Sequence, residues 1–361
     1  MLLFSEIILP ILLAFVITVM LIPNWIRVCD KWDLFERIND RKKHKINVPT
    51  AGGFAIFAGI IISFLLLGDD TSLHHDRYLI ASSLILFFTG YFDDLLDLPA
   101  GPKFALQLLA ATIIAIGGTR ISNLFGICGV NEIPVWLQYP ITILFITGIT
   151  NAYNLVDGLD GLAGSLGLMA SIVFGILFYN YDETGYAILS FCVAGALTGF
   201  LLFNFHPAKI FMGDTGSLII GFILSVMAIT LLDPNAADGL KIISINPLLV
   251  AAVLFVPVYD VFRVSVIRLL TGYSPFRPDR NHVHHMIMGQ GFGQRVTTLL
   301  IVMINILFIV LAILLEGLNI NLFLLLSVCV GMISINSLMM SKHASLYGKM
   351  GGRVYGKSVQ A

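Results

Sequence analysis

Long apolar stretches separated by short polar segments run along this chain from its first residues to about residue 340. A helix of about 20 apolar residues is long enough to cross a bilayer. The pattern predicts eleven membrane spans, the third and fourth of them short or interrupted: 2–22, 51–68, 78–96, 103–119, 136–153, 161–179, 185–203, 216–232, 246–268, 297–315 and 320–340. We therefore expect an all-α polytopic membrane protein, with one transmembrane domain over residues 1–341 and a tail over residues 342–361.

The distribution of Lys and Arg between the loops predicts the orientation of the chain. Residues 23–50 carry seven of them, and every second loop from there raises the count on that side to eighteen. The opposite side has three, Arg77, Arg120 and Lys241. Because the positive side faces the cytoplasm, we expect the N-terminus outside and the tail in the cytoplasm. The same alternation puts seven aspartates on the cytoplasmic side: Asp93, Asp94, Asp97, Asp157, Asp160, Asp214 and Asp279.

Composition supports the membrane assignment and narrows the function. Charged residues make up only 12% of the chain, against roughly 25% in soluble domains, and the mean hydropathy is +0.91. A net charge of −1 gives no reason to expect a nucleic-acid partner. The four cysteines are scattered, without metal-ligand spacing. The first 22 residues lack a basic start and include Glu6, so they predict a first span rather than a cleaved signal peptide.

Carboxylates that converge on one face of a membrane protein require a cation or a proton nearby. Asp93 and Asp94 end the third span, and Asp97 follows at a spacing that lets part of the triplet share a helical face. Lys103 begins the next span, where it can neutralise an acid or hold a phosphate. Taken alone, a solvated acidic helix end is the simpler interpretation. The repetition of acids on the same side favours a functional one.

Oxygen-bearing residues recur every three positions in the motif NAYNLVDGLDG. Asn151, Asn154, Asp157 and Asp160 therefore lie on neighbouring parts of one helical stripe. Such ligands suit Mg²⁺, which takes one or two carboxylates together with waters and substrate phosphates. The alternative is a glycine-rich packing segment in which the polar groups join helices.

In the motif HPAKIFMGDTGS a new helix opens at the Gly-Asp-Thr-Gly-Ser turn. Asp214 is a good N-cap type, so capping is one role for it. The amides of such a helix start also suit an anionic phosphate. Phe211 can stack on a base or anchor the chain at the membrane interface, and the motif alone favours the anchor.

The loop RPDRNHVHH concentrates cationic and metal-binding side chains on the cytoplasmic side: Arg277, Arg280, His282, His284 and His285. Histidine and arginine together suit phosphate oxygens, and the histidines also suit a metal. A solvated basic loop is the simpler interpretation of the run alone. Beside the acidic motifs, it describes a site for a diphosphate.

The ninth predicted span has two distinctive features. Pro247 and Pro257 predict a bend or break in it, and a broken helix at membrane depth lines a cavity or groove, here for a lipid tail. Asp260 and Arg263 have i,i+3 spacing, which predicts a structural ion pair.

Five motifs, in this order, resemble those of the polyprenyl-phosphate N-acetylhexosamine-1-phosphate transferase family: RKKHKINVPTAGG, DDLLDLPAGPK, NAYNLVDGLDG, HPAKIFMGDTGS and RPDRNHVHH. The resemblance covers residues 23–285 and implies a single catalytic domain in the bacterial inner membrane. It implies Mg²⁺-dependent transfer of a sugar-1-phosphate from a UDP-sugar to undecaprenyl phosphate, with release of UMP, as the first step of a cell-envelope polysaccharide. Mn²⁺ is the implied substitute metal, and a homodimer the implied assembly.

The resemblance also implies residue roles. The implied metal ligands are Asp214 and Asn154. The implied catalytic residues are Asp93, Asp94, Asp157 and His282, with the aspartate pair handling the lipid phosphate. The implied substrate-binding residues are Lys45, Thr50, Lys103, Leu159, Asp160, Asn204, Phe211, Arg280, His284 and His285. Among them Leu159, Asp160, Asn204 and Phe211 resemble the uridine pocket.

Alternatives remain at this point. The His-x-His-His loop is similar to the UDP-GlcNAc branch, and the phospho-MurNAc-pentapeptide transferase branch is the alternative. A secondary transporter also uses intramembrane acids and broken helices, but it predicts acids near mid-span and internal repeats. A phosphate monoester is a competent nucleophile because its second pKa is ~6. Direct attack is therefore favoured over a covalent aspartyl intermediate, and the sequence leaves both open.

Overall fold

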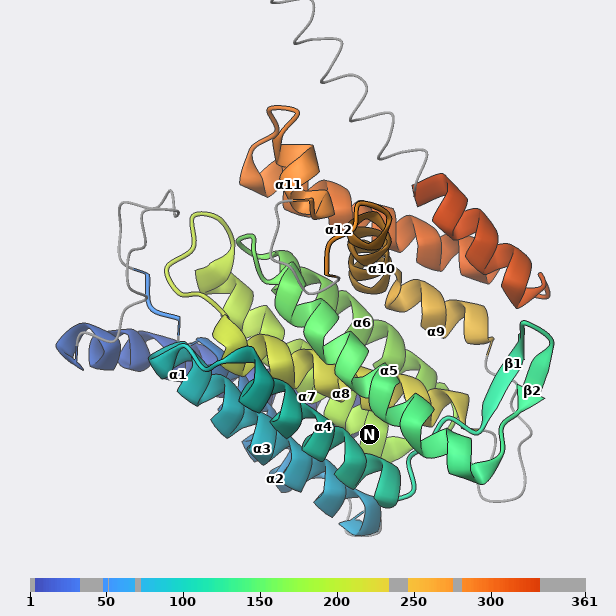
Figure 1. Cartoon of the computed structure of the whole chain (residues 1–361). Helices are drawn as coiled ribbons and strands as arrows, with labels where there is room; N and C mark the ends of the chain where they lie inside the picture. The colour runs from blue at the N-terminus through green and yellow to red at the C-terminus, as the bar shows by residue number, and fades with distance from the viewer. Residues whose placement is uncertain are drawn as a thin grey trace, which may run out of the picture.

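The computed structural model describes residues 4–32, 48–50, 52–68, 73–233, 246–274 and 281–331, and almost all of them are helical (Figure 1). The elements in chain order are a short π-helix, Phe4–Ile8, then α1 (Leu9–Trp32), α2 (Gly52–Leu67), α3 (Leu73–Leu96), α4 (Ala100–Ile116), β1 (Asn123–Ile127), β2 (Val130–Glu132), α5 (Val135–Val156), α6 (Leu162–Asn180), α7 (Thr184–Asn204), α8 (Gly213–Leu232), α9 (Pro247–Val253), α10 (Phe255–Leu270), α11 (Val283–Met288) and α12 (Gln294–Leu314). Lys45 and Arg280 lie outside the described residues.

Each of the eleven predicted spans overlaps a helix in the part of it that the structure describes, and the largest excess is in 103–119, where α4 ends at Ile116. Among the described residues, six helices are long and apolar enough to cross a membrane, and α9 with α10 would make a seventh. Three others, α2, α4 and residues Ile320–Gly331, are apolar but shorter. The protein is therefore a polytopic all-α membrane protein. The number eleven and the outward N-terminus stay predictions.

The predicted break in the ninth span is confirmed. Helices α9 and α10 meet at Leu254 with a bend of 72°. Asn305 of α12 fills the gap: its Oδ1 accepts from the amide of Val256 at 3.0 Å. Its Nδ2 donates to the carbonyls of Ala252 and Val253 at 3.3 and 3.1 Å. A buried side chain thus pairs the backbone groups that the break frees, as non-helical backbone at membrane depth requires.

A small β-hairpin, absent from the all-helical prediction, lies between α4 and α5 (Figure 1). Strands β1 and β2 pair antiparallel, and Gly126 and Gly129 adopt positive φ at the tight turn. The side chain of Asn321 fastens this turn, accepting from the amide of Cys128 at 2.9 Å and donating to the carbonyl of Gly126 at 2.8 Å. Strands this short carry little propensity signal, and the hairpin is stabilised by a residue almost 200 positions away.

Helix α8 is the most enclosed of the candidate spans: 89% of the residues in its most apolar 18-residue stretch are buried among the neighbouring helices. Glycines let α2 and α3 approach its N-terminal turn closely. A methyl group on Gly53 of α2 would overlap the backbone of Gly216, and one on Gly90 of α3 would lie 2.5 Å from Thr215 N. Backbones in contact through small residues are typical of helix packing in membranes. The start of α8 is therefore fixed between α2 and α3.

We expect Gly53→Ala to lower the melting temperature of the detergent-solubilised protein by several degrees, because the new methyl must push α2 away from α8. Gly148→Ala is the matched control, since an added Cβ there meets nothing within 4 Å. That control should leave the melting temperature unchanged or raise it slightly, because alanine favours helix over glycine by ~1 kcal/mol. Equal melting temperatures for the two variants would contradict the packing argument.

Candidate active site

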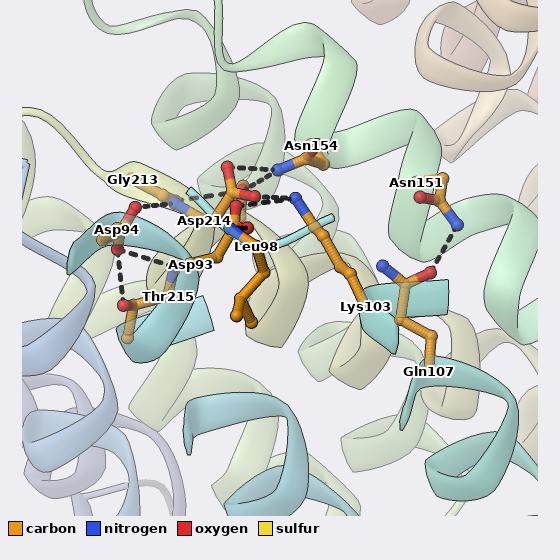
Figure 2. A network of polar contacts seen from close by, with 11 residues as sticks. Asp93, Asp94, Leu98, Lys103, Gln107, Asn151, Asn154, Gly213, Asp214 and Thr215 are labelled. Atoms are coloured by element: carbon orange, nitrogen blue, oxygen red, sulfur yellow. Dashed lines mark hydrogen bonds and ion pairs between the residues drawn. The ribbon is translucent and has the colours of Figure 1, made fainter. Parts of the chain in front are cut away.

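The N-terminus of α8 is capped by a carboxylate from another helix. Asp94, near the end of α3, accepts from the amide of Asp214 at 2.7 Å through Oδ1 (Figure 2). Its Oδ2 accepts from the amide and the hydroxyl of Thr215 at 3.0 and 2.6 Å. The first amides of a helix have no partner within it, so such an acceptor stabilises the helix start. The alternative that Asp214 itself is the cap is wrong: Asp214 lies inside the first turn.

The segment before α2 closes over this turn. Three backbone hydrogen bonds of 2.8 to 2.9 Å join Pro49, Gly52 and Gly53 to Phe211 and Met212. Thr50 thereby meets Gly213, whose φ is +69°. A side chain on Gly213 would overlap the carbonyl of Thr50 and lie 2.7 to 2.8 Å from the carboxylate oxygens of Asp94. Only glycine fits this position.

Four residues of the predicted site converge here from four helices, as Figure 2 shows. Lys103 of α4 places its Nζ between the carboxylates of Asp93 and Asp214, with 3.0 Å to Asp93 Oδ2. Asn154 of α5 donates from Nδ2 to Asp214 Oδ1 at 2.8 Å. The side chains of Lys103, Asp93 and Asp214 remain 17, 16 and 25% exposed. The cluster is therefore partly accessible to a ligand.

The donor set in this cluster fits a magnesium ion held jointly with substrate. Asp214 supplies a partly exposed carboxylate. The side-chain amide of Asn154 lies beside it, with Nδ2 donating to Asp214 Oδ1 and to Ser217 Oγ, so that Oδ1 of Asn154 is left as the ligand atom. Mg²⁺ binds one or two carboxylates and completes its shell with waters and phosphates. Within the described ranges, no group of three or more His, Cys, Asp or Glu could hold a metal alone.

The oxygen-bearing residues predicted to share one face of α5 have different partners in the structure. Asn154 belongs to the cluster, whereas Asn151 donates to Gln107 of α4 at 2.6 Å and joins the two helices (Figure 2). Asp157 forms the C-cap of α5. Burial, and next the negative charge of Asp94, raises the pKa of the Asp157 carboxyl, which the Gly213 amide partly offsets. Asp157 therefore binds a proton more readily than an ordinary aspartate.

Residues 281–286, which contain the described part of the histidine motif, are called the histidine segment. This segment approaches the turn that follows α5. A Cβ on Gly158 would lie 3.1 Å from Nε2 of His284, a tight contact that glycine avoids. His284 is 4% exposed, and the rings of His284 and His285 lie 4.3 Å apart. Burial lowers the pKa of His284 to about 4, with the positive charge of His285 acting in the same direction. His284 is therefore neutral at neutral pH.

The predicted ion pair on α10 is confirmed and does more than expected. Asp260 and Arg263 are 3 and 1% exposed, with 4.0 Å between Asp260 Oδ1 and Arg263 Nη1. Asp260 also contacts His282, and Arg263 donates to the carbonyl of Asn281 at 2.6 Å. Sequence reasoning missed this link. The available signal was a charge pair on the helix that directly precedes the histidine motif.

Two of the predicted uridine-pocket residues are engaged with the protein itself. Asn204 accepts from the amide of Gly161 at 2.9 Å and donates to the carbonyl of Ile210 at 2.8 Å. Asp160 Oδ2 lies 2.7 Å from Nδ1 of His206, a residue that sequence reasoning did not single out. These bonds fix the loop before α8 onto the turn before α6. Contact of either side chain with a substrate stays a prediction.

Leu159, the neighbour of Asp160, is 5% exposed, and Phe211 is partly exposed where its backbone pairs with residues 49–53. Their roles in a uridine pocket also stay predictions. So do those of Lys45 and Arg280, which lie outside the described residues.

The fold and the cluster define a class: a polytopic helical membrane protein with a charged site at the ends of its helices. A family model described as glycosyl transferase family 4 matches residues 77–232. The chain is 34% identical over 313 residues, 85% of each protein, to a probable undecaprenyl-phosphate N-acetylglucosaminyl 1-phosphate transferase of Bacillus subtilis.

Two further relatives are similar over most of their length. One is the undecaprenyl-phosphate alpha-N-acetylglucosaminyl 1-phosphate transferase of Yersinia pestis, 31% identical over 281 residues, 76% of this chain and 75% of the relative. The other is the decaprenyl-phosphate N-acetylglucosaminephosphotransferase of Mycobacterium tuberculosis, 35% identical over 286 residues, 73% of this chain and 70% of the relative.

The chain belongs to glycosyl transferase family 4. It is therefore a transferase, as the motifs predicted, and the secondary-transporter alternative is wrong.

We expect His284 to contribute a loss of stability as the pH falls from 6.5 toward 4. Across that range an unfolded chain protonates His284 at its ordinary pKa of 6.5, whereas the folded protein keeps it neutral down to about 4. The unfolded state then binds more protons, which lowers the free energy of unfolding. His284→Gln removes the titrating group and should reduce this acid loss by up to ~3 kcal/mol.

The measurement is the melting temperature of both proteins at pH 8 and pH 5. The difference between wild type and variant should change between the two pH values. A constant difference would contradict a buried, neutral His284.

Proposed function

We propose that this protein transfers a sugar-1-phosphate, GlcNAc-1-phosphate, from a UDP-sugar to undecaprenyl phosphate. The products are undecaprenyl-diphosphate-sugar and UMP, formed at the cytoplasmic face of the bacterial inner membrane. The names of the relatives, which describe N-acetylglucosaminyl 1-phosphate transfer to polyprenyl phosphates, support this reaction. The phospho-MurNAc-pentapeptide donor has no observation in its favour here.

The convergence of Asp93, Lys103, Asn154 and Asp214 is the observation that carries the proposal. Both proposed substrates are anions, so phosphoryl transfer between them depends on charge neutralisation and in-line positioning. The Lys103 ammonium provides one cation for these anions. The neighbouring carboxylates and the Asn154 amide provide ligands for a second cation, a metal ion. The accessible part of the cluster gives both phosphates a place to meet.

Asp214 and Asn154 would hold Mg²⁺, or Mn²⁺ in its place. The ion, when bound, supplies Lewis-acid stabilisation of the negative charge on the diphosphate and on departing UMP. Asp214 is well placed for this role because its backbone is fixed by the Asp94 cap while its carboxylate stays partly exposed.

The two members of the aspartate pair take different roles in this proposal. Asp93 and Lys103 manage the lipid phosphate: the Lys103 ammonium binds it, and Asp93 orients the ammonium at 3.0 Å. Both oxygens of Asp94 are already engaged by the start of α8, so Asp94 positions Asp214 instead. This revises the expectation that both aspartates handle the lipid phosphate.

Direct attack of the lipid phosphate fits these roles. An oxygen of the lipid phosphate forms a bond to the phosphorus that carries the sugar, and the bond from that phosphorus to the bridging oxygen breaks. The bridging oxygen leaves with the electron pair as part of UMP. A phosphate monoester is a competent nucleophile near neutral pH, because its second pKa is ~6. No protein base is needed to generate it.

The lipid phosphate would lie at Lys103 and Asp93, and the donor substrate would lie toward the histidine segment. His284, kept neutral by burial, approaches the turn that follows Asp157, and His282 and His285 surround it. Histidine side chains there suit the diphosphate and sugar oxygens of the donor. Leu159, Asp160, Asn204 and Phe211 form the proposed uridine side.

The proposal predicts which donor releases UMP. Wild-type protein in vesicles with added undecaprenyl phosphate and Mg²⁺ should release UMP from UDP-GlcNAc, much less from UDP-GalNAc, and none from UDP-MurNAc-pentapeptide. Asp214→Asn should reduce the rate by about 10³-fold, because the carboxylate is required for charge stabilisation at the diphosphate.

Asp182→Asn is the matched control, an exposed aspartate in the turn before α7 whose φ of +62° asparagine tolerates. It should keep the wild-type rate. Full activity of Asp214→Asn, or release from the pentapeptide donor alone, would contradict the proposal.

A further inference from the structure

The histidine segment is anchored at its start by two buried charged residues of α10. Asp260 Oδ2 lies 2.9 Å from Nδ1 of His282, and Asp260 Oδ1 accepts from the amide of Val283 at 2.9 Å. Arg263 donates to the carbonyl of Asn281 at 2.6 Å and to the sulfur of Met286 at 2.7 Å. One carboxylate and one guanidinium therefore contact four of the six residues from 281 to 286.

The contact between Asp260 and His282 determines which ring nitrogen carries a proton. An ionised carboxylate only accepts hydrogen bonds, so Nδ1 of His282 must donate. The other oxygen of Asp260 is engaged by the Val283 amide, and Arg263, with 4.0 Å between Nη1 and Oδ1, balances the buried charge. Nε2 is then the one ring nitrogen left for a substrate. A carboxylate behind a histidine fixes the tautomer and the ring orientation in this way.

The ring held by Asp260 belongs to a group of histidines that approaches the turn after Asp157. His282 is 6% exposed, and its ring lies 5.9 Å from that of His284 with an interplanar angle of 12°. His284 in turn meets Gly158, the residue after Asp157. The position of the His282 ring relative to the cluster is therefore set by α10, through Asp260.

We propose that Asp260 is a positioning residue: it fixes the tautomer and orientation of His282 so that Nε2 meets the donor substrate. The inference rests on the proposed function, since it concerns the UDP-sugar side of the same site. Asp260 does not contact the substrate itself, because His282 and the Val283 amide engage both of its oxygens.

Asp260→Asn is the sharpest change, because asparagine has one acceptor oxygen where aspartate has two. If that oxygen pairs with the Val283 amide, the NH₂ group faces Nδ1 and forces the proton onto Nε2. We expect kcat/KM for UDP-GlcNAc to fall by about 10- to 100-fold, the range for such supporting residues. Asp182→Asn serves again as the control that keeps activity.

A double-mutant cycle distinguishes positioning from general support of the fold. His282→Asn should lose at least as much activity as Asp260→Asn, and the double variant should fall no more than about threefold below His282→Asn. Asp260→Ala in the His282→Asn background should lose more, since it also leaves the Val283 amide unpaired. Losses for Asp260→Asn and His282→Asn that multiply, or wild-type activity of Asp260→Asn, would overturn the proposal.

A measurement on the unmutated pair covers the case in which the Asp260 variants do not fold. Nitrogen NMR of protein labelled at histidine, with His282→Asn to identify the signal, should show a protonated Nδ1 on His282. An unprotonated Nδ1 would overturn the proposal. This readout does not require transferase activity, so a wild-type protein that releases no UMP would refute the proposed function and leave the Asp260 inference to be decided by the spectrum.

Discussion

The structure depends on one hydrogen-bonded junction, the carboxylate of Asp94 on the first amides of α8. Residues 120 positions apart meet there, and both oxygens of the carboxylate are used. The first amides of a helix have no partner within the helix, so an acceptor from another helix stabilises its start. The cap therefore fixes the register of α8 against α3. Asp214, in the first turn, is placed beside Lys103 and Asn154 as a result.

The close contacts around this junction explain why its neighbours are small. Gly53 and Gly90 let two helices touch the backbone of α8, and Gly213 lets Thr50 and the Asp94 carboxylate lie against the turn. Each would be obstructed by a single methyl group. In the turn after α5, the absence of a side chain on Gly158 likewise leaves room for His284. Close backbone contacts between helices thus form the framework of the site, and this framework holds the charged side chains in place.

Local features of the sequence predicted the helices and the outline of the site. Apolar stretches predicted where the helices lie among the described residues, and prolines predicted the break at Leu254. Acids and amides at span ends indicated the residues that converge around Asp214. What was missed depends on contacts between distant segments. The Asn321 bonds to the hairpin, the Asp94 cap and the Asp260–His282 pair each join helices or loops that no periodicity connects.

The most direct test of this account compares Asp93→Asn with Asp94→Asn. Asp93 accepts from the Leu98 amide at 2.9 Å, and an asparagine in its place would keep an oxygen for that bond and lose only the charge that orients Lys103. An asparagine in place of Asp94 would turn its NH₂ group toward the amides of α8. The account predicts that Asp94→Asn lowers the melting temperature by several degrees, whereas Asp93→Asn leaves it nearly unchanged and abolishes activity. Equal melting temperatures for the two variants would contradict the central role of the Asp94 cap.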